Sequence, residues 1–278
     1  DGLLVKAGSG LMTGSVPDSA GVPAGYAAAT LLAEYNDIAS VRRLLEENKE
    51  QVACIVVEPV AANMGVVPPE EGFLASLREA ADAHGALLVF DEVITGFRLG
   101  LSGAQGYYGV TPDLSTFGKI VGGGMPLAAY GGRRDIMSCV APCGAVYQAG
   151  TLSGNPVAVT AGTEMLKLLI AHQEIYEQID QAAARLEAAY REIGLMVNRV
   201  GSLLSPFFTG EKVRDYRSVM TADTGAFARY FGWMLEKGVY VAPSQFEAMF
   251  VSAAHTEEMI GMTCDLIREY GKRHAILL

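Results

Sequence analysis

The sequence predicts an α/β protein whose large domain contains a mostly parallel β-sheet flanked by helices. Two short apolar runs lead to this prediction, at residues 53–57 and 87–90. The first run stops at Glu58 and the second at Asp91. Short apolar runs with polar ends are typical of buried strands in parallel sheets.

A helix is expected between these two strands. An apolar stripe recurs at helical spacing, formed by Phe73, Leu74, Leu77 and Ala81. The pattern closes at Gly85, a helix stop signal. Strand, helix and strand in this order form a βαβ unit, which requires parallel strands.

The rest of the chain divides into two parts. Elements expected outside the βαβ unit are helices at 36–49, 156–171, 175–193, 224–237 and 256–271, and strands at 128–132, 196–200, 203–208 and 239–241. Because the pattern changes after Gly194, we predict a large domain at residues 1–194 and a smaller C-terminal α+β domain at 195–278. The glycine-rich stretch at 6–25 is expected to be a long loop.

Composition narrows the class of protein. The net charge of -10 argues against nucleic-acid binding, and no apolar run approaches the roughly 18–20 residues of a membrane helix. The four cysteines form no zinc-ligand set, so we expect no metal and reduced thiols in the cytoplasm, or in the plastid stroma of a plant. The chain opens at Asp1 as if inside a domain, and we expect that an N-terminal part is missing.

An acid and a lysine define the expected chemistry. Asp91 ends a strand, where ligands bind in open α/β sheets, and Lys119 follows with three glycines close behind. A lysine amine forms Schiff bases with aldehydes such as pyridoxal phosphate, and a carboxylate can keep the pyridine nitrogen protonated. On these two residues alone, a turn-capping aspartate and a solvated lysine are the more ordinary interpretation.

Longer motifs change that balance. The sequence resembles the class III aminotransferases, a family of fold-type I pyridoxal-phosphate enzymes. The matching segments are EPV at 58–60, FDEVITGFR at 90–98, PDLSTFGKIVGGGMPLAAYGGR at 112–133 and QAGTLSGNPVAVTAG at 148–162. The resemblance covers nearly the whole chain and implies pyridoxal 5′-phosphate as cofactor, with pyridoxamine 5′-phosphate occurring in the cycle.

The resemblance also implies roles for individual residues. Lys119 would be the Schiff-base lysine and proton carrier, Asp91 the pyridinium partner, and Val93 a contact to the ring or plain core. Glu58 would support the ring oxygen or Asp91, or else form a turn. Thr151 and Gly150 would bind the cofactor phosphate across an interface, which makes a homodimer obligatory; the alternative is a helix-terminal loop without a ligand.

Three features are similar to the aminomutases of this family. They are a gating loop at 7–25, where Ser9 and Gly10 are candidate substrate contacts, the VYQAGTLSGNP stretch, and APSQFEAMFVSAAHTEE at 242–258. Glu247 would repel a substrate carboxylate, unless it is a surface glutamate. We therefore expect an isomerase acting on a small amino aldehyde. The alternatives are an ω-aminotransferase with a separate keto-acid acceptor and a non-catalytic cofactor-binding fragment.

Overall fold

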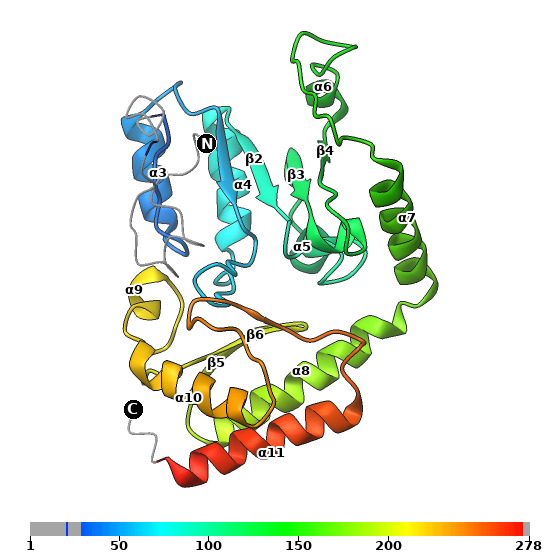
Figure 1. Cartoon of the computed structure of the whole chain (residues 1–278). Helices are drawn as coiled ribbons and strands as arrows, with labels where there is room; N and C mark the ends of the chain where they lie inside the picture. Colours follow the sequence, from blue (N-terminus) through cyan, green and yellow to red (C-terminus); the bar gives the residue numbers. More distant parts are fainter. Residues whose placement is uncertain (1–20, 22–28, 275–278) are drawn as a thin grey trace. The chain divides into compact units, whose positions relative to one another are not determined.

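The computed structural model describes Gly21 and residues 29–274, which divide into two compact units (Figure 1). The parallel-sheet unit contains Leu45–Pro59 and Glu71–Tyr176. The antiparallel-sheet unit contains Val60–Glu70, Glu177–Leu278 and the residues up to Leu44, as far as they are described. We predicted a domain change near residue 195, whereas this division falls after Tyr176 and is discontinuous along the chain.

The larger sheet has four strands in the order β1-β2-β3-β4. They are β1 (Cys54–Val57), β2 (Leu87–Asp91), β3 (Leu114–Phe117) and β4 (Ala129–Gly132). β1 pairs with β2 and β2 with β3 in parallel, while β4 runs antiparallel to β3. The prediction of a mostly parallel sheet flanked by helices is therefore confirmed.

Helix α4 (Phe73–His84) makes the crossover between β1 and β2. Its buried face contains the predicted stripe, and Gly85 ends it in the left-handed conformation with φ of 67°. The prediction that the first strand is buried was wrong. Cys54 is exposed and Val56 is 49% exposed, because β1 is an edge strand of this sheet.

The other helical segments that lie wholly in the parallel-sheet unit are α5 (Gly103–Tyr108), the 3₁₀ turn η1 (Lys119–Gly122), α6 (Arg134–Met137) and α7 (Pro156–Ala171). Asn155 caps α7 by accepting from the N–H groups of Val157 and Ala158, and Pro156 occupies the first turn. The expected helix at 156–171 is confirmed. The helix expected at 36–49 is shorter in the structure, where it forms α3 (Ile38–Glu47). The side chain of Asp37 caps its N-terminus by accepting from backbone N–H groups of the first turn.

The smaller sheet is antiparallel and combines β5 (Met196–Val200), β6 (Leu203–Phe207) and β7 (Met249–Phe250). With it belong α9 (Tyr216–Val219), α10 (Thr224–Glu236), α11 (Glu257–Arg273) and most of α8 (Glu174–Glu192). Buried aromatic rings fill the core, where the hydroxyls of Tyr190 and Tyr230 lie 2.7 Å apart. No helix in the described residues is both long and apolar enough to span a bilayer.

The strand predicted at 239–241 does not form. The N–H of Val239 donates to Met234 O at 2.9 Å, so it completes the C-terminal cap of α10 instead of pairing with a strand. Gly238, at φ of 84°, provides the left-handed turn that this cap requires. The strand that pairs with β6 on the side away from β5 is β7, ten residues further along the chain.

A short excursion of the chain explains the discontinuous division. Val60–Glu70 leaves the parallel-sheet unit after β1 and packs with β5 and β6. The N–H of Val66 donates to Ser205 Oγ at 3.0 Å, and its carbonyl accepts from Asn198 Nδ2 at 2.9 Å. Gly65 lies so close to Phe207 that an added Cβ would meet the ring at 2.6 Å.

Asp113 joins the elements at the other end of the larger sheet from Asp91. One carboxylate oxygen accepts from Arg78 Nη1 and from the N–H of Leu88, both at 2.8 Å. The other oxygen accepts from Arg133 Nη1 at 2.9 Å. Burial alone would raise the pKa of Asp113, but the Leu88 N–H and the two guanidinium groups outweigh it and lower the pKa to about 2.

We expect Asp113→Asn to lower the free energy of unfolding by about 3 kcal/mol at neutral pH, because it leaves Arg78 without its buried counter-ion. A carboxylate with a lowered pKa stabilises the fold above its ordinary pKa, and this contribution is lost as the pH falls toward the folded-state pKa of about 2. Urea unfolding at several pH values should therefore show the difference shrinking between about pH 4 and pH 2.

The matched control is Asp82→Asn, which removes the exposed partner of the same arginine. It should cost less than about 1 kcal/mol. If the two variants lowered the free energy of unfolding equally, the assignment of Asp113 as the residue that joins these strands would be contradicted.

Candidate active site

Three polar side chains line up where the parallel strands end. Asp91 is in register with Thr116 of β3. Val57 of β1 is in register with Phe90, so Glu58 follows β1 beside Asp91. Strands in a sheet are about 4.8 Å apart, so the three side chains form a short row along this edge. Ligands of open α/β sheets bind at such an edge.

The carboxylate of Asp91 is held from one side. Its Oδ1 accepts from the N–H of Val93 at 3.0 Å and from Thr116 Oγ1 at 3.3 Å. In the described part of the chain, Oδ2 has no hydrogen-bond partner, and the residue is partly exposed. Asp91 is therefore oriented while one oxygen stays available to a ligand.

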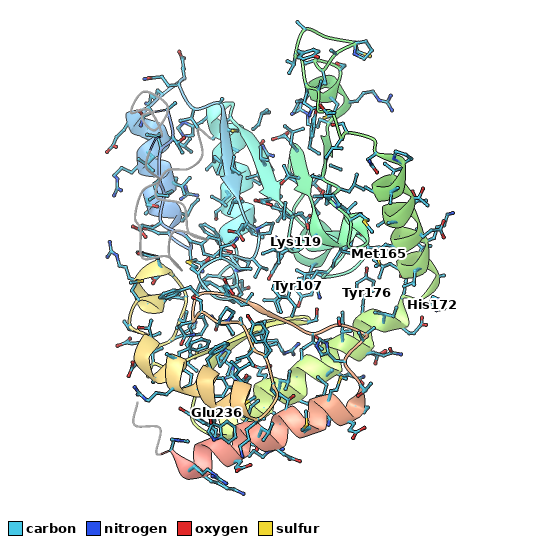
Figure 2. The ribbon with its side chains drawn as sticks, in the orientation of Figure 1. Tyr107, Lys119, Met165, His172, Tyr176 and Glu236 are labelled. Atoms are coloured by element: carbon cyan, nitrogen blue, oxygen red, sulfur yellow. The ribbon has the colours of Figure 1, made fainter. Side chains whose placement is uncertain are left out.

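Lys119 follows β3 and begins η1 (Figure 2). The side chain is exposed and forms no ion pair with any described residue. Its φ of 50° lies in the left-handed region, which costs a residue other than glycine about 1–3 kcal/mol. Such strain is found most often at functional sites, and here it sets the direction in which the amine leaves the backbone.

Val93 connects the two residues. In an extended chain it would lie on the same side as Asp91, two residues before it. The strand ends at Asp91, however, and Val93 belongs to a turn whose N–H points back to that carboxylate. Its side chain packs on Gly118, where an added Cβ would stand 3.2 Å from Val93 Cγ1. Val93 therefore contacts the residue that precedes Lys119.

A close contact between backbones holds η1 against α7. An added Cβ on Gly123 would stand 2.6 Å from Ala161 O, and one on Gly162 would stand 2.3 Å from Val121 O. Both distances are shorter than a carbon–oxygen contact allows, so each position requires glycine. The turn that begins with Lys119 is in this way seated on a long helix.

The predicted phosphate ligands lie in the turn before α7. Gly150 and Thr151 are both exposed, and Gly150 O accepts from the N–H of Ser153 at 2.9 Å. Neither residue is hydrogen-bonded to Asp91 or Lys119 in the described structure. Their role in phosphate binding stays a prediction.

Glu247 lies in the antiparallel-sheet unit. Its backbone is anchored, since its N–H donates to Ser244 O at 3.1 Å and its carbonyl accepts from Ser205 Oγ at 3.4 Å. Its side chain is exposed, and its proposed role toward a substrate carboxylate stays a prediction. Ser9, Gly10 and the 7–25 loop except Gly21 lie outside the described residues.

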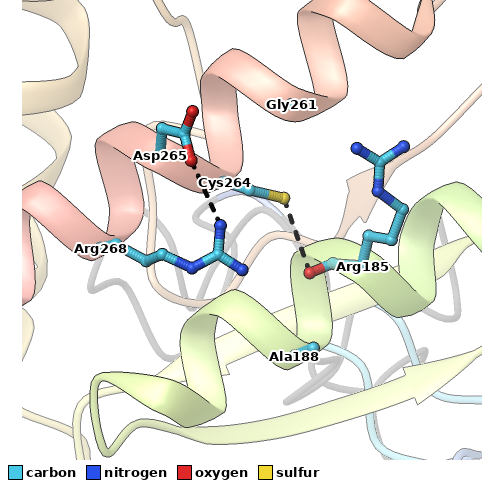
Figure 3. A pocket seen from close by; sticks show the side chains of 6 residues that line it. All are labelled: Arg185, Ala188, Gly261, Cys264, Asp265 and Arg268. Atoms are coloured by element: carbon cyan, nitrogen blue, oxygen red, sulfur yellow. Dashed lines mark hydrogen bonds and ion pairs between the residues drawn. The ribbon is translucent and has the colours of Figure 1, made fainter.

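A cavity of about 330 Å³ opens between α8 and α11 (Figure 3). Arg185 and Arg268 line it, but Arg185 pairs with Glu257, and Arg268 pairs with Glu192 and Asp265. These carboxylates already neutralise both guanidinium groups, so the cavity offers no free positive charge to an anionic ligand. Among the described residues, no three His, Cys, Asp or Glu side chains are grouped as a metal would require.

Sequence reasoning missed two residues near the strand ends. Thr116 hydrogen-bonds to Asp91, and Glu92 is fully buried beneath the turn that contains Val93. The alternation of side chains along a strand offered a signal for Glu92, since the residue after Asp91 must point to the opposite face. Nothing in the sequence indicated the role of Thr116, because it depends on the register of β2 and β3.

The chain belongs to the class III aminotransferase family, because the sequence model of that family matches residues 6–263. Its fold is that of fold-type I pyridoxal-phosphate transferases. Glutamate-1-semialdehyde 2,1-aminomutase 2 from Lachnoclostridium phytofermentans is 58% identical to this chain, with 98% of this chain and 65% of that protein covered. The chain thus spans about two thirds of the length of that relative.

Solved structures agree on the fold but differ in activity. An omega-transaminase from Sphaerobacter thermophilus is 28% identical with a TM-score of 0.82, covering 92% of this chain and 60% of its own. A glutamate-1-semialdehyde-aminomutase from Pseudomonas aeruginosa PAO1 in complex with PMP is also 28% identical, with a TM-score of 0.77 and coverages of 91% and 59%. The fold alone therefore does not select the reaction.

We expect Gly162→Ala to destabilise the protein by about 1–3 kcal/mol, because the new methyl group meets the carbonyl of Val121. The loss should appear even though alanine favours a helix over glycine by about 1 kcal/mol. The control is Gly131→Ala in β4, where an added Cβ meets nothing within 4 Å. The melting temperatures of the two variants are compared by thermal unfolding. A melting temperature of Gly162→Ala at or above that of Gly131→Ala would contradict the close contact between η1 and α7.

Proposed function

We propose that the protein is a pyridoxal-phosphate-dependent isomerase that converts (S)-4-amino-5-oxopentanoate, or glutamate 1-semialdehyde, to 5-aminolevulinate for tetrapyrrole synthesis. The observation that carries the proposal is the position of two residues at the ends of neighbouring strands: Asp91 is an oriented acid, and Lys119 is an exposed lysine. The 58% identity to an aminomutase supports the choice of reaction within the family.

The residues at this edge fit a protonated pyridine ring beside a lysine amine. The free oxygen of Asp91 would accept the ring N–H, and Val93 stands next to it. Glu58 and Thr116 flank Asp91 in the neighbouring strands. Gly150 and Thr151 would hold the phosphate through exposed backbone N–H groups and a hydroxyl. When bound, the cofactor supplies an electron sink for negative charge on the neighbouring carbon.

Lys119 would act first as the covalent anchor and then as a proton carrier. Its amine would carry protons in both halves of the reaction, giving one to the carbon that gains nitrogen and taking one from the adjacent carbon that loses nitrogen. The left-handed backbone of Lys119 and the seating of η1 on α7 restrict where the amine can travel. Asp91 would keep its negative charge toward the ring nitrogen throughout. Glu247 would disfavour a substrate carboxylate near it, so that the amino aldehyde can react at either end.

The reaction itself can be tested with one substrate. The protein, supplied with pyridoxal phosphate and glutamate 1-semialdehyde but no keto acid, is expected to form 5-aminolevulinate. Lys119→Ala should lower turnover by at least about 10³-fold and abolish the visible absorbance of lysine-bound cofactor. Lys49→Ala, which removes an exposed lysine paired with Glu46, should change neither.

The remaining outcomes separate the alternatives. A product that forms only after a keto acid is added would identify an ω-aminotransferase. Cofactor absorbance without turnover in either assay would identify a binding protein. Absence of lysine-bound cofactor in the unmodified protein would reject the proposal as a whole.

We also propose that the protein is a homodimer in which Gly150 and Thr151 serve the partner's cofactor. Exposed apolar side chains surround this turn and continue along α7. They are Val146, Tyr147, Leu152, Val157, Leu168 and Ile170, each at least 46% exposed. A helix that is apolar on most of its surface is normally buried, and a second copy would cover it. A cytoplasmic location would keep the exposed thiols of Cys54, Cys139 and Cys143 reduced.

Val157→Asp should convert the dimer to a monomer, because it places a charge within this apolar surface. An acid in the first turn of α7 is favourable to the helix itself, so the fold should persist. Met259→Asp is the matched control, an exposed apolar residue in the first turn of α11. Analytical ultracentrifugation measures the outcome. A monomeric unmodified protein, or a dimer in Val157→Asp, would contradict the proposed interface.

A further inference from the structure

Glu92 is a buried acid that the proposed mechanism does not use. Its side chain has no solvent exposure, and both carboxyl oxygens accept hydrogen bonds. Oε2 accepts from Thr95 Oγ1 at 3.0 Å and from the N–H of Ala104 at 2.7 Å. Oε1 accepts from Gln105, through Nε2 at 3.1 Å and the backbone N–H at 3.3 Å. These donors come from both ends of the segment that follows β2.

The segment is built closely around this carboxyl group. We call residues 92–105 the β2 loop. An added Cβ on Gly103 would stand 2.3 Å from Glu92 Oε2, and Gly103 has a φ of 57°. Gly96 donates its N–H to Glu92 O at 2.9 Å, and an added Cβ there would stand 2.6 Å from the same oxygen. The loop therefore closes tightly on Glu92, with glycine at both points of closest approach.

The closed β2 loop rests on the strand that leads to Lys119. Gln105 Nε2 donates to Ser115 Oγ at 3.0 Å as well as to Glu92. The rings of Phe97 and Phe117 have centroids 5.6 Å apart. Further along, the side chain of Val93 packs on Gly118, as described above. The loop thus contacts Ser115 and Phe117 of β3, and Gly118 directly after the strand, on the way to the lysine.

We propose that Glu92 is a positioning residue for the Asp91 and Lys119 pair. Its carboxyl group closes the β2 loop, and the closed loop places the N–H of Val93 against Asp91 Oδ1 and the side chain of Val93 against Gly118. The same buried acid thereby sets the direction of the carboxylate and the place of the lysine. The roles of Asp91 and Lys119 rest on the proposed function, whereas the closure of the loop by Glu92 does not.

A purely structural role makes a different prediction. A buried acid that only stabilises the fold would lower stability when replaced and leave cofactor binding unchanged. Asp113 is a matched example in the same sheet, since it too is a buried carboxylate that accepts a backbone N–H and side-chain donors. It lies at the opposite ends of β2 and β3, so Asp113→Asn is a control for lost stability alone.

The experiment compares Glu92→Gln with Asp113→Asn by three measurements at a temperature where both remain folded. The amide placed on Glu92 is a donor facing donors, so the β2 loop should open. Amide hydrogen exchange of the cofactor-free chain should speed up at Ala104, Gln105 and Val93 in Glu92→Gln only. Pyridoxal phosphate should bind at least about tenfold more weakly, as when partners that orient a ligating group are lost. The pH at which lysine-bound cofactor changes its absorbance should move by about one unit.

Each result decides a separate point. Unchanged affinity and an unchanged absorbance midpoint in Glu92→Gln, or equal changes in Asp113→Asn, would overturn the positioning role. If the unmodified protein binds no pyridoxal phosphate, the proposed function fails, and the exchange of Val93 still decides whether Glu92 holds this turn. Gln105→Met is the second variant if Glu92→Gln does not fold. It removes the bridge to Ser115 and should reproduce the same changes in milder form.

Discussion

Parallel pairing of β1, β2 and β3 is the constraint on which the candidate site depends. Parallel strands end at the same edge of a sheet, so Glu58, Asp91 and Thr116 meet although they are far apart in the chain. The register determines which side chains share a face, because a shift by one residue would turn Asp91 toward the opposite face. Lys119 then follows β3 on the same edge.

The two adjacent acids at the end of β2 differ in their surroundings. Asp91 is partly exposed and keeps one oxygen free, while Glu92 is buried with both oxygens occupied. Side chains alternate along a strand, so adjacent acids face opposite ways and can hold different roles. The strained backbone at Lys119 is tolerated because Val93 and the close contact between η1 and α7 hold it from two sides.

Family membership and reaction rest on different observations. The sheet edge with Asp91 and Lys119 suits any pyridoxal-phosphate aminotransferase of this fold, and an omega-transaminase matches the structure as well as an aminomutase does. The substrate proposal depends instead on sequence identity and on Glu247, which lies outside the parallel-sheet unit. A fold supplies the frame for a cofactor, whereas the substrate is chosen by the residues placed around it.

The sequence by itself determined the βαβ unit, most of the longer helices, and Asp91 and Lys119 as an acid and a lysine that follow strands. These features depend on the periodicity of apolar residues and on local motifs, both of which can be read from neighbouring residues of the sequence. Only the tertiary structure decided that β7 completes the smaller sheet beside β6, that Val60–Glu70 belongs to the antiparallel-sheet unit, and that Glu92 is buried beneath the site. Each of these depends on contacts between residues distant in the sequence, and such contacts leave no periodic trace.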